Sequence, residues 1–194
     1  MTKTLIVPGL EGSPAPHWQH WWAMTDPQAL TVDLPETAQP NPDHWEIELA
    51  GAILRHPDSI LVGHSLGSIL IARLLSRWPQ LRVRAAVLVA PAETFGSDRI
   101  GQFGRIPEQA LDIPTTVVAS HDDPWMGFSR AAGLADAWGS RLIDLGRAGH
   151  INSAAGFGPW PEAKRLRDDL LLRSARPAAL TARPLFRDRS SHHA

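Results

Sequence analysis

One serine, Ser65, lies between two glycines in the segment Gly63-His64-Ser65-Leu66-Gly67. Before it, residues 59–62 form an apolar run typical of a buried strand, and after it residues 66–78 have the apolar spacing of an amphipathic helix. A serine on a tight turn between strand and helix projects its hydroxyl from the edge of a sheet, where glycines let the two elements approach closely. These residues predict a nucleophilic serine for acyl transfer.

The alternative for Ser65 is purely structural, because serine is a preferred residue at the start of a helix. A helix cap alone does not call for glycine on both sides, which favours the nucleophile. In that case the N–H of Leu66, at the helix N-terminus, would stabilise an oxyanion. Leu10 would give a second N–H, since it lies in the glycine-bearing turn 8–12 after an apolar run. An ordinary connection between strand and helix is the other interpretation of that turn.

A serine hydroxyl needs an adjacent base, and the base needs a third group that fixes its orientation. His150 ends a Gly-His turn that follows the apolar residues 141–145, and Asp122 and Asp123 follow the apolar residues 115–119. Both turns come just after predicted strands, in the chain order serine, acid, histidine. Physical reasoning does not separate the two acids, because either carboxylate could reach His150 and one could cap the helix that follows.

Among the nine histidines, His150 is the predicted base, because it ends the turn after residues 141–145. His121 also follows a downstream strand, but it lies beside the acids and is interpreted as a surface residue. His64 lies in the serine turn itself and is expected to orient that turn or to line the substrate pocket. His17 and His20 share one helical face, but two histidines without a third ligand make a weak metal site. No metal is therefore predicted.

Three tryptophans, Trp18, Trp21 and Trp22, have the i, i+3, i+4 spacing of one helical face. A stripe that packs against the sheet is the favoured interpretation, and an aromatic wall of the substrate pocket is the alternative. Trp18 is nevertheless expected near the mouth of the pocket, because its helix follows the oxyanion turn. Gly9, in that turn, and Trp125, after the two acids, are further candidates for substrate contact.

The elements that must position these residues alternate regularly along the chain. Strands are predicted at residues 4–7, 30–34, 59–62, 85–90, 115–119 and 141–145, and helices at 16–24, 43–56, 66–78, 129–138 and 161–173. This alternation predicts a three-layer α/β/α sandwich with a mostly parallel sheet of about six strands. Such sheets bind ligands at the carboxyl ends of their strands, where the candidate residues lie. The segment 93–112 is expected to be a long loop with a short helix, too short for a separate cap domain.

The composition suits one domain without a nucleic-acid partner. Its 194 residues are 43% hydrophobic, and 19 Lys and Arg nearly balance 20 Asp and Glu. This balance gives no field that would attract nucleic acid or an anionic membrane, and no apolar run is long enough to span one. The lack of cysteine and of a signal-peptide pattern favours a cytoplasmic location. We expect a domain over residues 1–173 and a mobile tail over 174–194.

Taken together, these motifs resemble the RBBP9/YdeN-like serine hydrolase family, a small lidless branch of the α/β-hydrolases. The resemblance spans most of residues 4–170 and rests on Ile6-Val7-Pro8-Gly9 with His17-Trp18 and Trp21 downstream, Gly63-His64-Ser65-Leu66-Gly67, Ser120-His121-Asp122-Asp123-Pro124 and Gly149-His150. It implies an α/β-hydrolase fold without a cap domain. It also implies a catalytic triad of Ser65, Asp123 and His150, in which the acid is the aspartate just before the proline. The sequence departs from the family at Trp125, since the family often continues toward a second proline there.

The resemblance implies an enzyme that cleaves small carboxylic esters, thioesters or amides through an acyl-enzyme at Ser65, without a cofactor. Two other functions stay open, namely a protein-binding module on a hydrolase scaffold and an acyltransferase or peptidase with the same triad. The intact triad residues argue against the binding module. Reaction of Ser65 with an active-site probe distinguishes an enzyme from a binding module. The product that forms then distinguishes a hydrolase from an acyltransferase or a peptidase.

Overall fold

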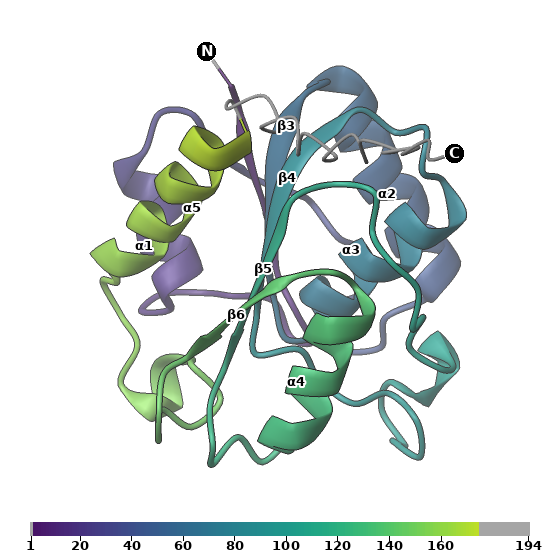
Figure 1. Ribbon diagram of the computed structural model, residues 1–194, viewed down its shortest axis with the longest axis vertical. Helices are drawn as coiled ribbons and strands as arrows, with labels where there is room; N and C mark the ends of the chain where they lie inside the picture. The colour runs from purple at the N-terminus through teal and green to yellow at the C-terminus, as the bar shows by residue number, and fades with distance from the viewer. Residues whose placement is uncertain (1, 175–194) are drawn as a thin grey trace, which may run out of the picture.

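Six parallel strands form one sheet through the centre of the protein (Figure 1). The strands are β1 (Thr4–Val7), β2 (Ala29–Thr31), β3 (Ser59–His64), β4 (Val83–Val89), β5 (Thr115–Ala119) and β6 (Arg141–Asp144). They lie in the order β2-β1-β3-β4-β5-β6, and each neighbouring pair is parallel. The computed structural model describes residues 2–174, so the predicted tail lies, apart from Ser174, outside the described residues.

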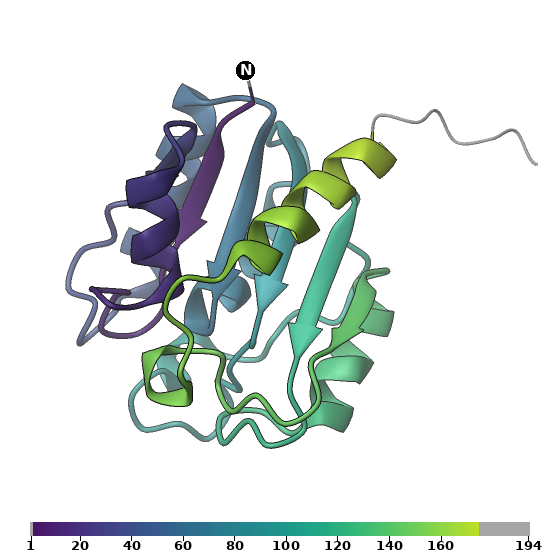
Figure 2. The same cartoon turned by 90° about the vertical axis from the view of Figure 1, so that its left-hand side faces the viewer.

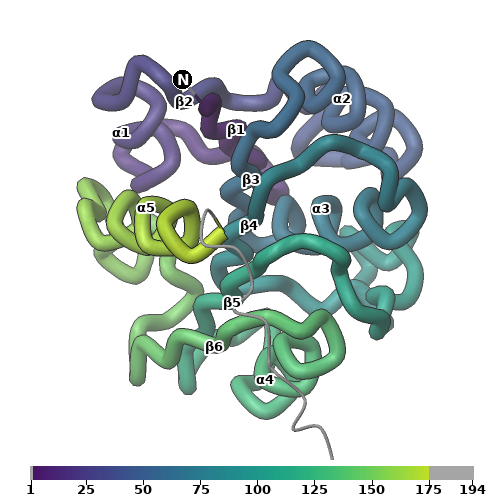
Figure 3. The backbone as a smooth tube through the Cα atoms, turned by 45° about the horizontal axis from the view of Figure 1, so that its top comes forward, coloured from purple at the N-terminus to yellow at the C-terminus, as the bar shows by residue number. Residues whose placement is uncertain are grey.

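Within residues 2–174, five α-helices cover the two faces of the sheet (Figures 2 and 3). On one face lie α1 (Trp18–Thr25) and α5 (Pro161–Ser174), and on the other α2 (Pro42–Arg55), α3 (Leu66–Arg77) and α4 (Phe128–Ala137). Each face has its own apolar cluster, with Trp18 and Trp22 in one and Trp45 and Trp138 in the other. The predicted three-layer sandwich is confirmed. In the described part of the chain, no helix is both long enough and apolar enough to cross a membrane.

Most elements begin and end within two residues of their predicted bounds, but β2 is shorter than predicted. The Val32 N–H still donates to the Ile6 carbonyl at 2.8 Å, and the chain then leaves the sheet. Val32 and Leu34 are buried in the same cluster as Trp45 of α2. Their apolar character therefore reflects core packing rather than strand pairing.

The connections at the carboxyl ends of the strands contain no separate cap within residues 2–174. The longest of them joins β4 to β5 and contains one short 3-10 helix, Gly101–Phe103, as the sequence predicted. The strand order reverses between β1 and β3, because the chain runs outward from β1 to β2 and then returns to β3. A crevice for ligands forms at such a reversal. The turns after β1 and β3, with Leu10 and Ser65, lie at this point.

Candidate active site

The turn between β3 and α3 holds Ser65 in an unusual backbone conformation. Its φ is 56° and its ψ is −123°, a region that residues with a side chain rarely adopt. Backbone strain of this kind costs about 1–3 kcal/mol and is kept only where the surroundings enforce it. The Ser65 side chain makes no capping hydrogen bond to α3. The geometry therefore does not support the interpretation of Ser65 as a helix cap.

Close backbone packing explains the two glycines that flank the turn. A Cβ on Gly67 would lie 2.3 Å from the Val7 carbonyl oxygen, and a Cβ on Gly63 would lie 2.8 Å from the Cα of Ser68. Both separations are shorter than any real contact of such atoms, so a side chain at either position would push the helix away from the strands. Glycine at these positions lets the N-terminus of α3 lie directly behind Ser65.

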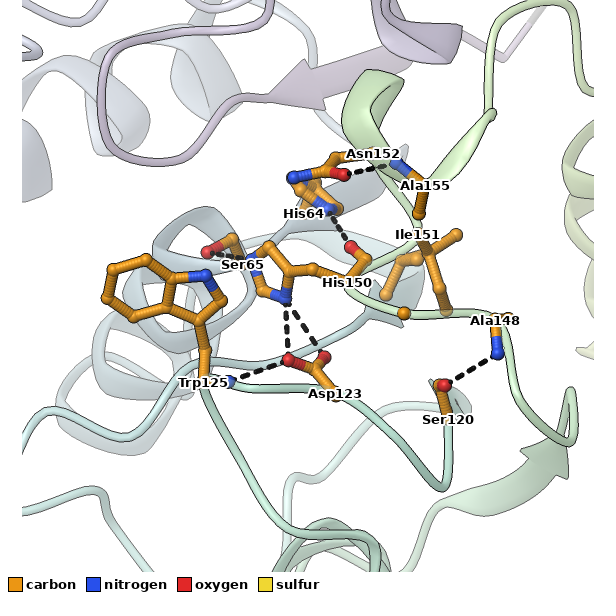
Figure 4. Close-up of polar contacts among 12 residues, drawn as sticks. His64, Ser65, Ser120, Asp123, Trp125, Ala148, His150, Ile151, Asn152 and Ala155 are labelled. Carbon is orange, nitrogen blue, oxygen red and sulfur yellow. Dashed lines mark hydrogen bonds and ion pairs between the residues drawn. The ribbon is translucent and has the colours of Figure 1, made fainter.

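Ser65, His150 and Asp123 form one hydrogen-bonded row across three turns of the chain (Figure 4). Nε2 of His150 lies 2.9 Å from Oγ of Ser65, and Nδ1 lies 2.9 Å from each carboxylate oxygen of Asp123. The side chains of His150 and Asp123 are 8% and 4% exposed. This arrangement can take the proton from a serine hydroxyl while the acid fixes the orientation of the ring.

The structure separates the roles of the two neighbouring acids. Oδ1 of Asp122 accepts from the Gly149 N–H at 2.8 Å and from Oγ of Ser120 at 2.8 Å, while Ser120 in turn accepts from the Ala148 N–H. These hydrogen bonds, with that from Gly149 largest, hold the pKa of Asp122 below its ordinary value. Asp122 therefore joins the two loops, and Asp123 is the acid that faces His150.

Two backbone N–H groups near Ser65 are available to an oxyanion. Leu66 is the first residue of α3, where the N–H has no acceptor within its own helix. Within residues 2–174, neither this N–H nor that of Leu10 has a backbone acceptor elsewhere. Gly9 does not line the cavity beside Ser65 but lies behind it, where an added Cβ would be 2.9 Å from the Cβ of Ser65. Gly9 thus lets the turn after β1 lie against the serine turn.

A cavity of about 410 Å³ opens beside Ser65 and His150. Its apolar lining residues include Leu10, Leu66, Ala92, Ile100 and Trp125. Its polar lining residues include Glu11, His17, His64, Arg99, Asn152 and Ser153. Sequence reasoning identified Leu10, His64, Leu66 and Trp125 among these residues. It missed Asn152 and Ser153. The available signal for both residues was their position in the chain, shortly after His150.

Two buried histidines, His64 and His17, lie side by side next to His150. The centroid of the His64 ring lies 4.9 Å from that of the His150 ring and 4.8 Å from that of the His17 ring. Burial, with a smaller effect from His150, lowers the pKa of His17 to about 4 and that of His64 well below its ordinary value. Both rings are therefore neutral at pH 7 and act through hydrogen bonds rather than charge.

Trp18 does not lie where the sequence suggested. Its side chain is fully buried, its Nε1 donates to the Ile151 carbonyl at 2.9 Å, and it packs among other aromatic rings, including Trp22 and Trp160. The expectation that Trp18 reaches the mouth of the pocket is wrong, because the whole indole is needed to pack α1 against the sheet and α5. Trp125 is 44% exposed and lines the cavity, with its ring centroid 6.0 Å from that of His150.

Several known proteins are similar to this chain in sequence and fold. A solved YdeN-like hydrolase from Pectobacterium atrosepticum is 36% identical, with a TM-score of 0.80 over 89% of this chain and 92% of that chain. YdeN of Bacillus subtilis (strain 168), described as a hydrolase, is 25% identical over 176 residues, which are 83% of this chain and 92% of that protein. A thermophilic esterase has the same fold at 15% identity, with a TM-score of 0.69 over 90% of this chain and 91% of its own.

The family model described as serine hydrolase matches residues 4–168. This range includes every strand of the sheet and each of the three turns that bring Ser65, Asp123 and His150 together. The chain therefore belongs to the serine hydrolase family and is similar to its YdeN-like members.

Proposed function

We propose that this protein hydrolyses small carboxylic esters through an acyl-enzyme on Ser65. The observation that supports the proposal most directly is the buried row in which His150 contacts the Ser65 hydroxyl on one side and the Asp123 carboxylate on the other. A positioned base and an orienting acid are what a serine needs to become a nucleophile at neutral pH. The family and the hydrolase names of its relatives support a hydrolytic reaction.

The reaction begins when Oγ of Ser65 attacks the acyl carbon and its proton passes to Nε2 of His150. Asp123 stabilises the imidazolium that forms, because both of its oxygens face Nδ1. The N–H groups of Leu66 and Leu10 donate to the oxyanion of the tetrahedral intermediate. When the carbon–oxygen bond of the ester breaks, His150 returns the proton to the leaving alcohol. Water then attacks the acyl carbon while His150 takes its proton. The carboxylic acid leaves as His150 returns the proton to Oγ of Ser65, and no cofactor takes part.

The cavity suits a small acyl substrate with two chemically distinct ends. Its volume of about 410 Å³ lies near the lower end of the range for small-molecule sites, roughly 300–1,000 Å³. Its apolar lining residues, Trp125 among them, can hold a short acyl chain, and its polar lining residues, such as Asn152, can contact the alcohol part. We therefore favour esters of small acids over esters of long-chain fatty acids. Thioesters and amides are further substrates of the same chemistry.

The test is labelling of the full chain with a fluorophosphonate probe, followed by mass spectrometry. Wild type is expected to be labelled stoichiometrically at Ser65, the Ser65→Ala variant not at all, and the His150→Ala variant about 1,000-fold more slowly. Turnover of short 4-nitrophenyl esters would then establish ester hydrolysis. Wild-type protein that is folded but unlabelled would exclude the proposed mechanism, and faster transfer to an added alcohol or amine than to water would replace hydrolysis with acyl transfer.

A further inference from the structure

Gln19 is a buried glutamine whose amide joins three separate segments of the chain. It lies in the first turn of α1 and is 1% exposed. Its Nε2 donates to the carbonyl oxygens of Val7 at 3.2 Å and of Val62 at 3.1 Å. Its Oε1 accepts from Oγ of Ser13 at 2.6 Å. Because the two carbonyls can only accept, the nitrogen must face them, and the orientation of the amide is fixed.

The carbonyls that Gln19 contacts lie at or near the ends of the strands that lead into the oxyanion site. Val7 is the last residue of β1 and Val62 is paired with Ile6 on the neighbouring strand β3. Each lies three residues before a residue of the proposed site, Val7 before Leu10 and Val62 before Ser65. One amide group therefore bridges the paired strands β1 and β3 close to where their two turns leave the sheet.

The helix that holds Gln19 is itself tied to the base loop. Trp18, the preceding residue, donates through Nε1 to the carbonyl of Ile151, directly after His150 in the chain. His17 caps the helix, since its Nδ1 accepts from the Gln19 N–H at 3.1 Å. The start of α1, which carries Gln19, is consequently held in place. The hydrogen bonds of the Gln19 amide can therefore define where the two strand ends lie relative to each other.

Packing alone does not require an amide at this position. Trp18 and Trp22 flank Gln19 on the buried face of α1, and an apolar side chain of equal length would fill the same space. A buried amide is costly unless its hydrogen bonds are made, and here both donors and the acceptor are used. The hydrogen bonds that Gln19 makes to the two strands and to Ser13 therefore explain the amide better than packing does.

We propose that Gln19 is a positioning residue that sets the separation of the Leu10 and Leu66 N–H groups. This inference rests on the proposed serine hydrolase function. The effect of an oxyanion donor depends on its exact position. The donor must lie about 2.7–3.1 Å from the place that the oxygen takes in the transition state. An amide that fixes both donor-bearing segments acts on the transition state without touching the substrate.

The experiment compares the Gln19→Met variant with wild type and with a matched control, Trp138→Phe. Trp138 is also fully buried and donates through Nε1 to the carbonyl of Pro107 at 2.7 Å, but at the end of α4 remote from the turns of the site. For each protein, kcat and KM are measured on a 4-nitrophenyl ester. Inhibition is measured with a trifluoromethyl ketone, to which Ser65 adds to form a tetrahedral oxyanion, and with the corresponding methyl ketone, which binds without addition.

For Gln19→Met, kcat is expected to fall about 100-fold while KM stays within about threefold of wild type. Affinity for the trifluoromethyl ketone falls by a similar factor, and affinity for the methyl ketone does not change. The Trp138→Phe control loses thermal stability but keeps kcat and both affinities within about twofold. Ser13→Ala, which removes one of the three bonds, gives the same pattern at about threefold to tenfold, and it serves as the test if Gln19→Met does not fold.

Gln19→Met and Ser13→Ala variants that keep wild-type kcat, or that lose affinity for both ketones equally, would overturn the positioning role. Failure of the proposed function looks different. In that case the wild-type protein itself would not turn over the ester and would bind the two ketones alike, and the inference would fall with it.

Discussion

Nε2 of His64 lies 2.9 Å from the backbone carbonyl oxygen of His150, whose ring contacts Ser65 (Figure 4). Burial keeps the pKa of His64 well below its ordinary value, so its ring is neutral, and because a carbonyl only accepts, the proton must be on Nε2. The residue directly before the proposed nucleophile therefore holds the backbone of the proposed base. This bond links the two turns independently of the bond between Ser65 and the ring.

Replacing His64 with phenylalanine removes this donor and leaves the His150 carbonyl buried without it. We expect the free energy of unfolding to fall by about 1–3 kcal/mol and kcat to fall about tenfold, because the base loop loses its support. Urea unfolding and steady-state kinetics measure the two effects. His64→Gln, which keeps an N–H donor, should lose less of both. Equal stability and activity of the phenylalanine variant and wild type would contradict this role.

The two neighbouring aspartates give a second prediction. Asp123→Asn removes the carboxylate from Nδ1 of His150 and should lower kcat about 1,000- to 10,000-fold with little change in stability. Asp122→Ala removes the acceptor of the Gly149 N–H and of Ser120, so it should lower the midpoint of urea unfolding and should lower kcat by less than about tenfold. Kinetics and urea unfolding on both variants test the assignment, which would be reversed if Asp122 were the variant with the larger kinetic loss.

The residues of the proposed triad could be named from the sequence because their signals are local. Glycines two residues on either side of Ser65 and the Gly-His turn at His150 are patterns of a few neighbouring positions. The choice between Asp122 and Asp123 could not be made from spacing, since both follow the same strand. It depends on which carboxylate turns toward Gly149 and which toward His150, and this is decided by contacts between β5 and β6 loops far apart in the chain.

Residues that act through distant contacts were harder to predict. The tryptophan spacing indicated a buried face of Trp18, Trp21 and Trp22, but the fully buried residues are Trp18, Gln19 and Trp22, while Trp21 is half-buried beneath Lys164. A glutamine is usually taken as solvent-facing, so nothing local marked Gln19 as buried. Its acceptors belong to two strands that become neighbours only when the sheet forms.

The buried His17 predicts how stability depends on pH. Its pKa is about 4 in the folded protein, mainly because of burial, against an ordinary value of 6.5. Between these values the unfolded chain takes up a proton that the folded protein does not, so stability falls as the pH falls from 6.5 toward 4 and is constant above 6.5. This histidine alone should cost about 2 kcal/mol between pH 7 and pH 5.

The His17→Asn variant tests this pH dependence, because asparagine still caps α1 but does not titrate. Its loss of stability between pH 7 and pH 5 should be smaller than that of wild type by about 2 kcal/mol, as measured by urea unfolding at both pH values. His20, exposed on the same helix, is the matched control, and His20→Asn should behave as wild type. An unchanged difference in the His17→Asn variant would show that His17 does not cause it.

Trp125 predicts a preference among acyl chains. Trp125 lines the cavity and is 44% exposed. Its backbone N–H donates to Asp123 at 2.9 Å and is kept in any substitution. Trp125→Ala should lower kcat/KM about tenfold more for a hexanoate than for an acetate ester, because the longer chain buries more surface against the ring. Trp125→Phe should keep most of the preference. Equal losses for the two esters would place the acyl chain elsewhere in the cavity.

The strained turn at Ser65 predicts that two variants that both lack the proposed nucleophile differ in stability. Ser65→Ala and Ser65→Gly both remove the hydroxyl, but only glycine adopts a φ of 56° and a ψ of −123° without strain. The glycine variant should be about 1 kcal/mol more stable than the alanine variant, after the greater freedom of glycine in the unfolded chain is taken into account. Urea unfolding measures the difference. An alanine variant as stable as the glycine variant would mean that the turn is relaxed. The expected result would mean that the Ser65 N–H bond to Val89 and the close contact with Gly9 hold the hydroxyl in place against the preference of the backbone.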